Sequence, residues 1–273
     1  MLNKDRIEIS LTTERIGRRL IYLPVTGSTN TIAKELAAEG APDGTVVVAG
    51  EQSAGRGRLG RRWLAPPGTC VLCSILFRPD ISLARAPHLT MLCSMAAADA
   101  VGQTSTLWPD LKWPNDLIVA HGSSGWGKLA GLLTETGVTG NRLDFVVVGI
   151  GINVNVPLEL LPTLAADATS ILTEIGRPVD VVALLAVLLS EVEQRYRGLQ
   201  AGGSPYQEWA SRLATIGQQV AASTAAGPIT GIAEYVDEGG TLFLRTAGGV
   251  LHRLSAGDVT LMNPQASRER RTR

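Results

Sequence analysis

The sequence predicts an α+β fold in which helices flank a mixed or largely antiparallel sheet, followed by a small β-barrel at the C-terminus. Short β-rich runs alternate with turns at hairpin spacing, which favours hairpins over the helical crossovers of a doubly wound parallel sheet. Two long apolar or amphipathic segments, residues 82–101 and 181–199, predict helices that cover the sheet. From residue 217 onward short strand-like runs and turn sequences replace the helical pattern, which predicts a separate β unit.

In the first part of the chain, each predicted element is bounded by a turn or a breaker. Residues 20–25 predict the first strand, and residues 31–38 predict a helix with Ile32 and Leu36 on one face. The other predicted elements are strands at residues 45–52, 69–78, 111–113 (continuing past Pro114 as 117–120), 129–136 and 143–149, and helices at residues 82–101, 181–199 and 206–213.

The C-terminal part predicts four short strands, at residues 218–223, 229–236, 241–245 and 250–254. Turn sequences such as AGP and EGG separate them. We therefore expect a larger domain at residues 1–214, a β-barrel domain at 215–263, and a disordered arginine-rich tail at 264–273.

The composition narrows the classes of protein. With 273 residues, of which 45% are hydrophobic, the chain can bury a large core, and its net charge of zero provides no global field for nucleic acid or membrane. Cys70, Cys73 and Cys93 are too few for a disulfide framework. Cys70 and Cys73 spell C-x-x-C, but alternation along a strand sends them to opposite faces, so we expect no shared metal. Without a secretory signal or a membrane-spanning run, we expect a cytoplasmic protein.

The stretch GRGRLGRRW, from Gly55 to Trp63, contains four arginines and three glycines directly after a predicted strand. Glycine lets the backbone approach a ligand closely, and arginine offers a charged, planar donor fork to phosphate or carboxylate. The pattern predicts a flexible cationic loop that closes over an anion. The alternative is a solvated basic turn.

The same stretch also spells G-x-G-x-x-G, the fingerprint of dinucleotide-binding proteins. That site requires a helix that opens among the glycines, whereas Pro66 and Pro67 follow here and exclude one. The sequence also contains no G-x-x-x-x-G-K-[ST] string, so a phosphate-binding P-loop is not predicted.

Four further stretches accompany this loop along the chain. They are GSTN at residues 27–30, KWPND at 112–116, GKLAGLLTE at 127–135 and VGIGINVN at 148–155. With the loop, they make the chain resemble the biotin–protein ligases over about residues 21–155, and the C-terminal segment resembles the SH3-like domain of that family. Each motif is weak by itself, whereas five in this order and spacing are specific.

The resemblance implies a two-step, ATP-dependent ligase. The carboxylate of biotin attacks the α-phosphorus of Mg·ATP to give biotinyl-5′-AMP and pyrophosphate. A lysine of a biotin carboxyl carrier domain, part of a biotin-dependent carboxylase, then takes the biotinyl group and releases AMP. Bringing two anions together requires fixed cations, and phosphoryl-centre chemistry depends mainly on positioning and charge. Mg²⁺ is expected to arrive with ATP, with few or no protein ligands.

The resemblance also assigns roles to residues of this chain. Lys128 should contact the biotin carboxylate and the α-phosphate, while Arg56 and Arg58 should hold the acyl-phosphate and close the loop that contains Gly55 and Gly57. The residues expected around the ureido ring are Ser28, Thr29, Asn30 and Gln52. Those expected on the nucleotide side or near the reacting groups are Trp63, Lys112, Asn115, Asp116, Gly131 and Asn153.

Several of these residues have a second interpretation. Ser28 or Thr29 can be the N-cap of the following helix, and Trp63, expected near the adenine, can equally be a core aromatic. The amide of Gln52 can end a strand, or it can both donate to and accept from a ureido group. Asp116 is expected to orient a cation or to receive the proton of the acceptor lysine.

Two other functions compete with biotin ligation. A lipoate or octanoate ligase or transferase of the same superfamily would bind an apolar ring that does not need the polar group around Ser28 and Gln52. A non-catalytic biotin- or nucleotide-sensing module would not need Lys128 together with the arginine loop. Fewer than thirty residues precede Ser28, so we expect neither the DNA-binding domain of the bifunctional family members nor contact with DNA. A monomer or weak homodimer is expected.

Overall fold

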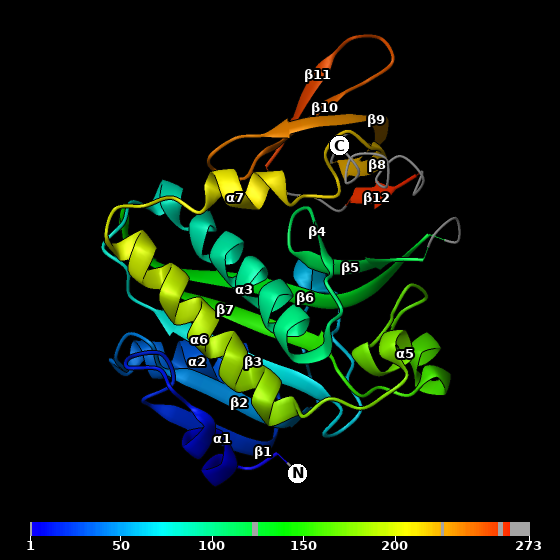
Figure 1. The fold of residues 1–273 in the computed structure, drawn as a ribbon. Coiled ribbons are helices and arrows are strands. Elements are labelled where there is room, and N and C mark those ends of the chain that lie inside the picture. Colours follow the sequence, from blue (N-terminus) through cyan, green and yellow to red (C-terminus); the bar gives the residue numbers. More distant parts are fainter. Residues whose placement is uncertain (1, 122–124, 225–226, 256–258, 263–273) are drawn as a thin grey trace.

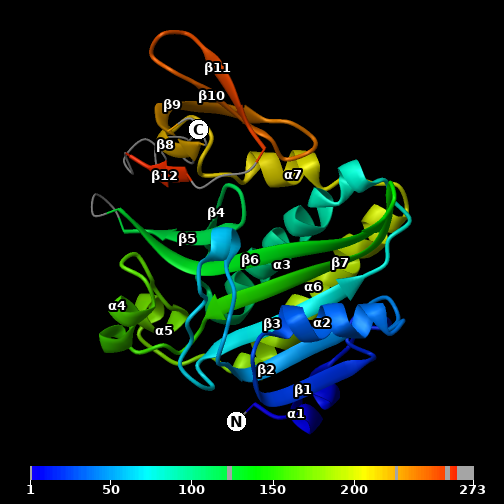
Figure 2. The ribbon, with the colours of Figure 1, turned by 180° about the vertical axis from the view of Figure 1, so that it is seen from behind.

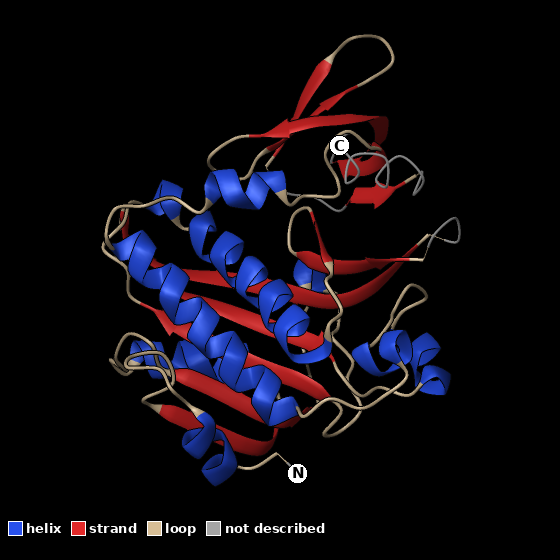
Figure 3. Cartoon of the chain, in the orientation of Figure 1, coloured by secondary structure: helices blue, strands red, loops and turns tan. Residues whose placement is uncertain are grey.

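A computed structural model describes residues 2–121, 125–224, 227–255 and 259–262. Its main feature is a seven-stranded mixed sheet in the order β1-β2-β3-β7-β6-β5-β4 (Figure 1). The strands are β1 (Leu20–Thr26), β2 (Val46–Gln52), β3 (Cys70–Phe77), β4 (Asp110–Lys112), β5 (Asp116–Ala120), β6 (Trp126–Thr139) and β7 (Arg142–Asn153). The mixed sheet with flanking helices confirms the predicted α+β class (Figure 3).

Helices cover both faces of this sheet. The helices are α1 (Lys4–Ser10), α2 (Thr29–Ala38), α3 (Pro87–Ser105), α4 (Leu161–Leu164), α5 (Ile171–Ile175), α6 (Val181–Gln200) and α7 (Tyr206–Ser211), with short 3-10 turns η1 (Arg58–Gly60), η2 (Leu83–Arg85) and η4 (Leu158–Leu160). Figure 1 shows α3 and α6 lying together across one face, and Figure 2 shows α2 on the other. Among the described residues, no helix is both long and apolar enough to cross a membrane.

The sheet is mixed because its first two strands are joined differently from the rest. Helix α2 connects β1 to β2 as a crossover, so these strands run parallel, whereas every other neighbouring pair in the sheet is antiparallel. Strand β3 lies near the middle and all of its residues are buried. Cys73 contributes to the large core and Cys70 to a small cluster on the other side, as predicted for opposite faces. Burial raises the pKa of the Cys70 thiol to about 11 and that of Cys73 to about 12.

Two predicted elements differ from the structure. The run 111–120 was predicted as one interrupted strand, but β4 and β5 form an antiparallel hairpin in which Lys112 pairs with Asp116. The chain therefore reverses at Pro114 and brings both ends of the KWPND stretch together. The helix predicted at 82–101 consists of η2 followed by α3, which continues to Ser105. Helices α1, α4 and α5 were not predicted from the sequence, because α1 carries few apolar residues and α4 and α5 are only 4 and 5 residues long.

A second, antiparallel sheet has five strands in the order β11-β10-β9-β8-β12. They are β8 (Gln219–Thr224), β9 (Gly227–Val236), β10 (Leu242–Arg245), β11 (Leu251–Leu254) and β12 (Val259–Leu261). The prediction of four strands was wrong by one, because β12 is three residues long and is recognisable only from its pairing with β8. The five antiparallel strands are consistent with the predicted SH3-like fold. The tail predicted at 264–273 lies outside the described residues.

Two side chains from the part of the chain that forms the large sheet, Trp113 and His88, hold this second sheet in place. The Trp113 indole Nε1 donates to the carbonyl oxygen of Gly240 at 2.8 Å, and His88 Nε2 lies 3.0 Å from the carbonyl oxygen of Glu238. Both contacts fix the turn between β9 and β10. They attach the second sheet beside the hairpin of β4 and β5, where it comes within reach of the cavity described below.

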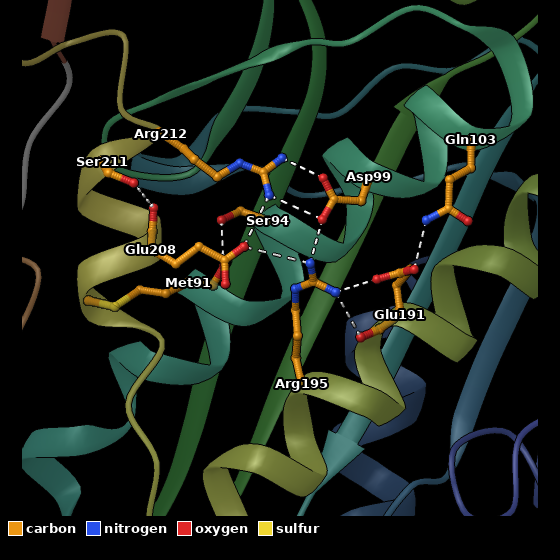
Figure 4. Close-up of polar contacts among 9 residues, drawn as sticks. All are labelled: Met91, Ser94, Asp99, Gln103, Glu191, Arg195, Glu208, Ser211 and Arg212. Atoms are coloured by element: carbon orange, nitrogen blue, oxygen red, sulfur yellow. Dashed lines mark hydrogen bonds and ion pairs between the residues drawn. The ribbon is translucent and has the colours of Figure 1, made fainter.

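An ion network fixes α7, which leads into the second sheet, against α3 and α6 (Figure 4). Asp99 on α3 receives Arg195 from α6 and Arg212 from the end of α7, with 2.6 Å between Arg212 Nη2 and Asp99 Oδ1. Arg195 also pairs with Glu191 and lies 3.7 Å from Glu208. The side chain of Asp99 is 16% exposed, so removing it would leave two arginines partly buried without their shared carboxylate.

Candidate active site

A cavity of about 600 Å³ lies between the N-terminus of α2, strands β6 and β7, and the arginine–glycine loop. It is lined by all of the residues predicted for the site except Gly55, among the residues that the structure describes. Lining residues that range along the chain from Ser28 to Thr260 come together here, and the antiparallel pairing of β3, β7, β6 and β5 places those of the large sheet side by side. The cavity has a polar, hydrogen-bonded end around α2 and a cationic end around β4 and β5.

The polar end is built on the first turn of α2. Ser28 occupies the N-cap position, but the structure shows no side-chain capping bond from it, and Ser28 lines the cavity instead. Thr29 donates from both its backbone N–H and its hydroxyl to Gln52 Oε1, at 2.7 and 3.1 Å. The two segments predicted to surround one ligand group are therefore bonded directly to each other.

Asn30 is held by the protein on three sides. Its Oδ1 accepts from the hydroxyl of Ser74 at 2.6 Å, and its Nδ2 donates to the Leu133 carbonyl at 3.1 Å and to Glu135 Oε2 at 3.0 Å. A Cβ on Gly149 would lie 2.1 Å from Asn30 Oδ1, so a glycine is needed at that position of β7. Asn30 is 3% exposed. Its amide lines the polar end of the cavity and also holds Ser74 and Glu135 in place there.

The arginine–glycine loop folds as a small hairpin around the turn η1. Its two arms are joined by Trp63 N–H to the Gly55 carbonyl at 2.9 Å and by Gly57 N–H to the Arg61 carbonyl at 2.7 Å. A Cβ on Gly55 would lie 2.4 Å from the Trp63 carbonyl oxygen, so this glycine permits the close approach of the arms. Leu59, at the tip, has a φ of 55° and is 68% exposed. The predicted arginine–glycine loop is thus a hairpin whose arms are hydrogen-bonded to each other.

Both arginines expected to hold the acyl-phosphate contact the protein. Arg56 Nη2 pairs with Glu135 Oε2 at 2.5 Å, and Arg58 Nη1 donates to Asn115 Oδ1 at 3.0 Å. Asn115 in turn donates from Nδ2 to the carbonyl oxygen of Leu132. The loop is thereby attached to β6 on one side of the cavity and to the β4–β5 hairpin on the other.

At the cationic end, Lys128 Nζ lies 2.8 Å from Asp116 Oδ1, and the Asp116 side chain is 9% exposed. The cation that Asp116 contacts is thus a side chain of the protein itself. The Lys128 ammonium also lies 5.9 Å from the centroid of the Trp63 ring. Lys112 is half-buried on β4, which lies next to the Asp116 strand β5, and it lines the same space.

The indole of Trp63 packs against two glycines of the sheet, Gly131 on β6 and Gly151 on β7. A Cβ on Gly151 would lie 2.5 Å from Trp63 Cε2, and one on Gly131 would lie 3.0 Å from Cζ3. At both glycines the group that comes close to the strand is the indole of Trp63. The indole Nε1 is buried without a hydrogen-bond partner among the described residues. Trp63 is therefore both a packed aromatic and a wall of the cavity.

Two segments that line the cavity were missed by the sequence analysis: residues 164–168, before α5, and Val259 and Thr260 of β12. The first runs beside β6, where the Thr169 N–H donates to the Lys128 carbonyl at 2.9 Å. No motif marks either segment, because each is short and reaches the cavity only through the fold. Asn153, predicted on the nucleotide side, is 3% exposed and donates to the Thr169 carbonyl at 3.0 Å, so it also fixes this segment.

Comparison with known proteins decides the family. The model of the biotin/lipoate A/B protein ligase family matches residues 22–153, and that of the biotin protein ligase C-terminal domain matches residues 215–262. The bifunctional ligase/repressor BirA of Bacillus subtilis is 36% identical over 263 residues, which cover 95% of this chain and 79% of that protein. The biotin–[acetyl-CoA-carboxylase] ligase of Mycobacterium tuberculosis is 35% identical over 277 residues, covering 95% and 98% of the two chains.

The chain belongs to the biotin protein ligase family. Among solved structures, the biotin protein ligase of Aquifex aeolicus in complex with biotin and ATP has a TM-score of 0.71 and 26% identity, covering 90% of this chain and 99% of that one. Both family matches fall on the parts of the chain that contain the two sheets. The predicted membership and fold class are thereby confirmed.

Among the described residues, no group of three or more His, Cys, Asp or Glu side chains could hold a metal ion. The Asp116 carboxylate, at the cationic end of the cavity, pairs with Lys128.

Proposed function

We propose that the protein is an ATP-dependent ligase that activates biotin as biotinyl-5′-AMP and transfers the biotinyl group to a lysine of a biotin carboxyl carrier domain. The observation that carries this proposal is a single cavity with a bonded polar end, around Thr29 and Gln52, and a cationic end, around Lys112 and Lys128. A polar ring joined to a carboxylate by an apolar chain matches such a cavity. Of the two ligands named for the related Aquifex structure, biotin has this chemistry, and the phosphates of ATP suit the cationic end.

For the first step, we propose that the ureido ring of biotin binds beside Ser28, Thr29 and Gln52, whose amide and hydroxyl groups can donate and accept. The valeryl chain then directs its carboxylate toward Lys128. One carboxylate oxygen attacks the α-phosphorus of ATP, the bond to the bridging oxygen breaks, and pyrophosphate leaves with the magnesium ion. The lysine charge offsets the negative charge gathered between carboxylate and phosphate, which lowers the barrier without a covalent enzyme intermediate.

Asp116 is proposed to position Lys128. A lysine side chain has four flexible bonds, and the ion pair at 2.8 Å restricts them so that the ammonium faces the cavity. Lys112 and Arg58 are proposed to add positive charge on the phosphate side, with Asn115, Trp63 and Asn153 on the nucleotide side. Mg²⁺ enters as Mg·ATP.

In the second step, the neutral amine of the carrier lysine attacks the acyl carbon of the adenylate. An amide bond forms, the bond from the acyl carbon to the phosphate oxygen breaks, and AMP leaves with the electron pair. The amine loses a proton in this step, and we propose Asp116 as a candidate to receive it. The carrier is proposed to be a domain of a biotin-dependent carboxylase, in line with the name of the Mycobacterium relative.

The wider setting follows from the same proposal. We propose a catalytic domain at residues 1–214, an SH3-like domain at 215–263, a cytoplasmic location, and a monomer or weak homodimer that does not contact DNA. A lipoate or octanoate ligase is the second candidate of the same superfamily. It is disfavoured by the polar groups around Ser28 and Gln52, to which an apolar dithiolane ring offers no hydrogen bonds, and by the match to the biotin protein ligase C-terminal domain.

The test is incorporation of biotin into a purified carrier domain, detected by avidin blotting, together with biotin-dependent exchange of pyrophosphate into ATP. We expect labelling that requires both ATP and biotin and is absent when the target lysine of the carrier is replaced by arginine. Lipoate in place of biotin should give exchange at least about 10⁴-fold slower, because it lacks the hydrogen-bonding ring. Exchange that proceeds equally well with lipoate, or no exchange with either acid, contradicts the proposal.

A further inference from the structure

Glu135, on β6, is a charged residue that the proposed mechanism has not used. Its carboxylate contacts Lys34 of α2 at 2.8 Å, Asn30 at 3.0 Å and Arg56 of the arginine–glycine loop at 2.5 Å. The side chain is 21% exposed, and within the described part of the chain it is not one of the groups lining the cavity. It lies two residues beyond Leu133, which does line it. Glu135 therefore meets the loop from just outside the cavity.

A continuous set of hydrogen bonds joins this carboxylate to the polar end of the cavity. Thr29 donates to Gln52, Ser74 contacts the Thr29 hydroxyl at 2.7 Å and Asn30 Oδ1 at 2.6 Å, and Asn30 donates to Glu135. Ser74 is fully buried, and Thr29 and Asn30 are each 3% exposed. In such a setting the bonds are strengthened by the low local dielectric, and every member has a fixed orientation.

The charges around Glu135 keep it ionised. Burial by itself would raise the pKa of this carboxyl, but the bonds from Lys34 and Asn30 and the charge of Arg56 outweigh it and lower the pKa below its ordinary value of 4.5. Arg56 thus has a protein carboxylate as its partner before any substrate binds, and because Glu135 also pairs with Lys34 the three side chains together keep one positive charge. The same contact attaches the loop to β6 while Arg56 still lines the cavity.

We propose that Glu135 is a positioning residue that fastens the arginine–glycine loop across the cavity through Arg56, so that the activated biotin is retained until the carrier lysine arrives. The loop has a second attachment, from Arg58 to Asn115 of the β4–β5 hairpin. We call the loop held by these two contacts, Arg56 to Glu135 and Arg58 to Asn115, the strap. This inference rests on the proposed function, because retention is needed only if an acyl-adenylate is formed.

The main variant is Glu135→Gln, which removes the charge and keeps an amide that can still accept from Asn30. The release rate of biotinyl-5′-AMP, measured by trapping free adenylate, should rise about tenfold, the value of one charge-assisted hydrogen bond. Biotin-dependent exchange of pyrophosphate should change less than about threefold, because Lys128 is untouched. The matched control is Glu234→Gln, which breaks a glutamate–arginine pair with Arg245 in the second sheet and should leave the release rate at the wild-type value.

Arg56→Gln and the double variant complete the test. If the two residues act as one fastening, the release rate of the double variant should equal that of either single variant within about twofold. Release rates that multiply in the double variant, or an unchanged rate in Glu135→Gln, overturn the proposal. So does a rise in Glu135→Gln that is absent from Arg56→Gln, since Glu135 would then act through Asn30 and Lys34 instead of the loop.

Hydrogen exchange of the ligand-free protein separates this inference from the proposed function. The strap predicts faster exchange at residues 54–62 in Glu135→Gln than in the wild type, a result that does not depend on activity. Wild-type protein that forms no adenylate at all refutes the proposed function, whereas equal exchange at this loop in the two proteins refutes the strap.

Discussion

Replacing Lys128 by methionine tests the centre of the proposed chemistry. The substitution keeps most of the volume of the side chain and removes the ammonium group that lies 2.8 Å from Asp116. If this ammonium faces the carboxylate and the α-phosphate during the first step, it is a preorganised charge whose loss costs about 10²–10³ in rate, or roughly 3–4 kcal/mol of barrier. We expect biotin-dependent pyrophosphate exchange to fall by that factor at saturating substrates.

The same substitution has a cost in stability that must be separated from the loss of rate. It leaves the Asp116 carboxylate, 9% exposed, without its cation. An unpaired charge in such a position costs about 1–3 kcal/mol, and solvent contact through the partly exposed Lys128 site places the expected value toward the lower end. Thermal unfolding of Lys128→Met should therefore begin a few degrees lower than that of the wild type.

The double variant Lys128→Met with Asp116→Asn distinguishes the two effects. Replacing the carboxylate by a neutral amide should restore most of the lost stability and none of the lost exchange activity. The reasoning is refuted if Lys128→Met retains exchange within about threefold of the wild type. It is equally refuted if the double variant regains activity along with stability, because the defect would then come from the unpaired carboxylate.

Four further predictions follow from contacts described above. Arg58→Gly should release adenylate about 10–100-fold faster, seen as biotin labelling of bystander albumin, and labelling no greater than that of the wild type contradicts it. Gly149→Ala should weaken biotin binding at least about tenfold in calorimetry, because its Cβ would lie 2.1 Å from Asn30 Oδ1; unchanged affinity would show that Asn30 moves freely. Asp99→Asn should lower the free energy of unfolding by about 3 kcal/mol in denaturant titration, and a loss below about 1 kcal/mol would show that solvent already screens the network. Burial lowers the pKa of His88 below 6.5, so as the pH falls through 6.5 this residue takes up a proton in the unfolded chain before it does so in the folded chain. The free energy of unfolding should therefore decrease from pH 7.5 to pH 5.5, and His88→Gln should flatten that dependence.

The sequence predicted the site residues well where several of them lie close together in one short stretch of the chain. The arginine–glycine loop, the Lys112 to Asp116 stretch and Lys128 are recognisable because each places charged or amide groups beside glycine or proline breaks. All three line one cavity. The periodic patterns likewise predicted α6 and the paired strands β6 and β7, since burial of one face imposes a regular spacing on the chain.

What the sequence did not contain were the partners of those residues. Glu135 belongs to the GKLAGLLTE stretch, but the sequence assigned it no role, because only the fold places it beside Arg56. Ser74 lies in a strand whose residues are all buried, and nothing in the sequence distinguishes it from its neighbours. Strand β12 and residues 164–168 reach the cavity through contacts between segments far apart in the chain. Hydrogen bonds and ion pairs of this kind depend on distances in space, and periodicity records only distances along the chain.

The sequence by itself determined the class of fold, the family and the residues able to supply charge and hydrogen bonds to a carboxylate and a nucleotide. The tertiary structure decided how these groups are held: Lys128 against Asp116, Arg56 against Glu135, and Asn30 in the space left by Gly149. The physical reason is that residue type fixes what a group can donate, accept or neutralise. Packing of the sheet against α2 and the loop fixes which of those possibilities are already satisfied inside the protein and which are turned toward the cavity.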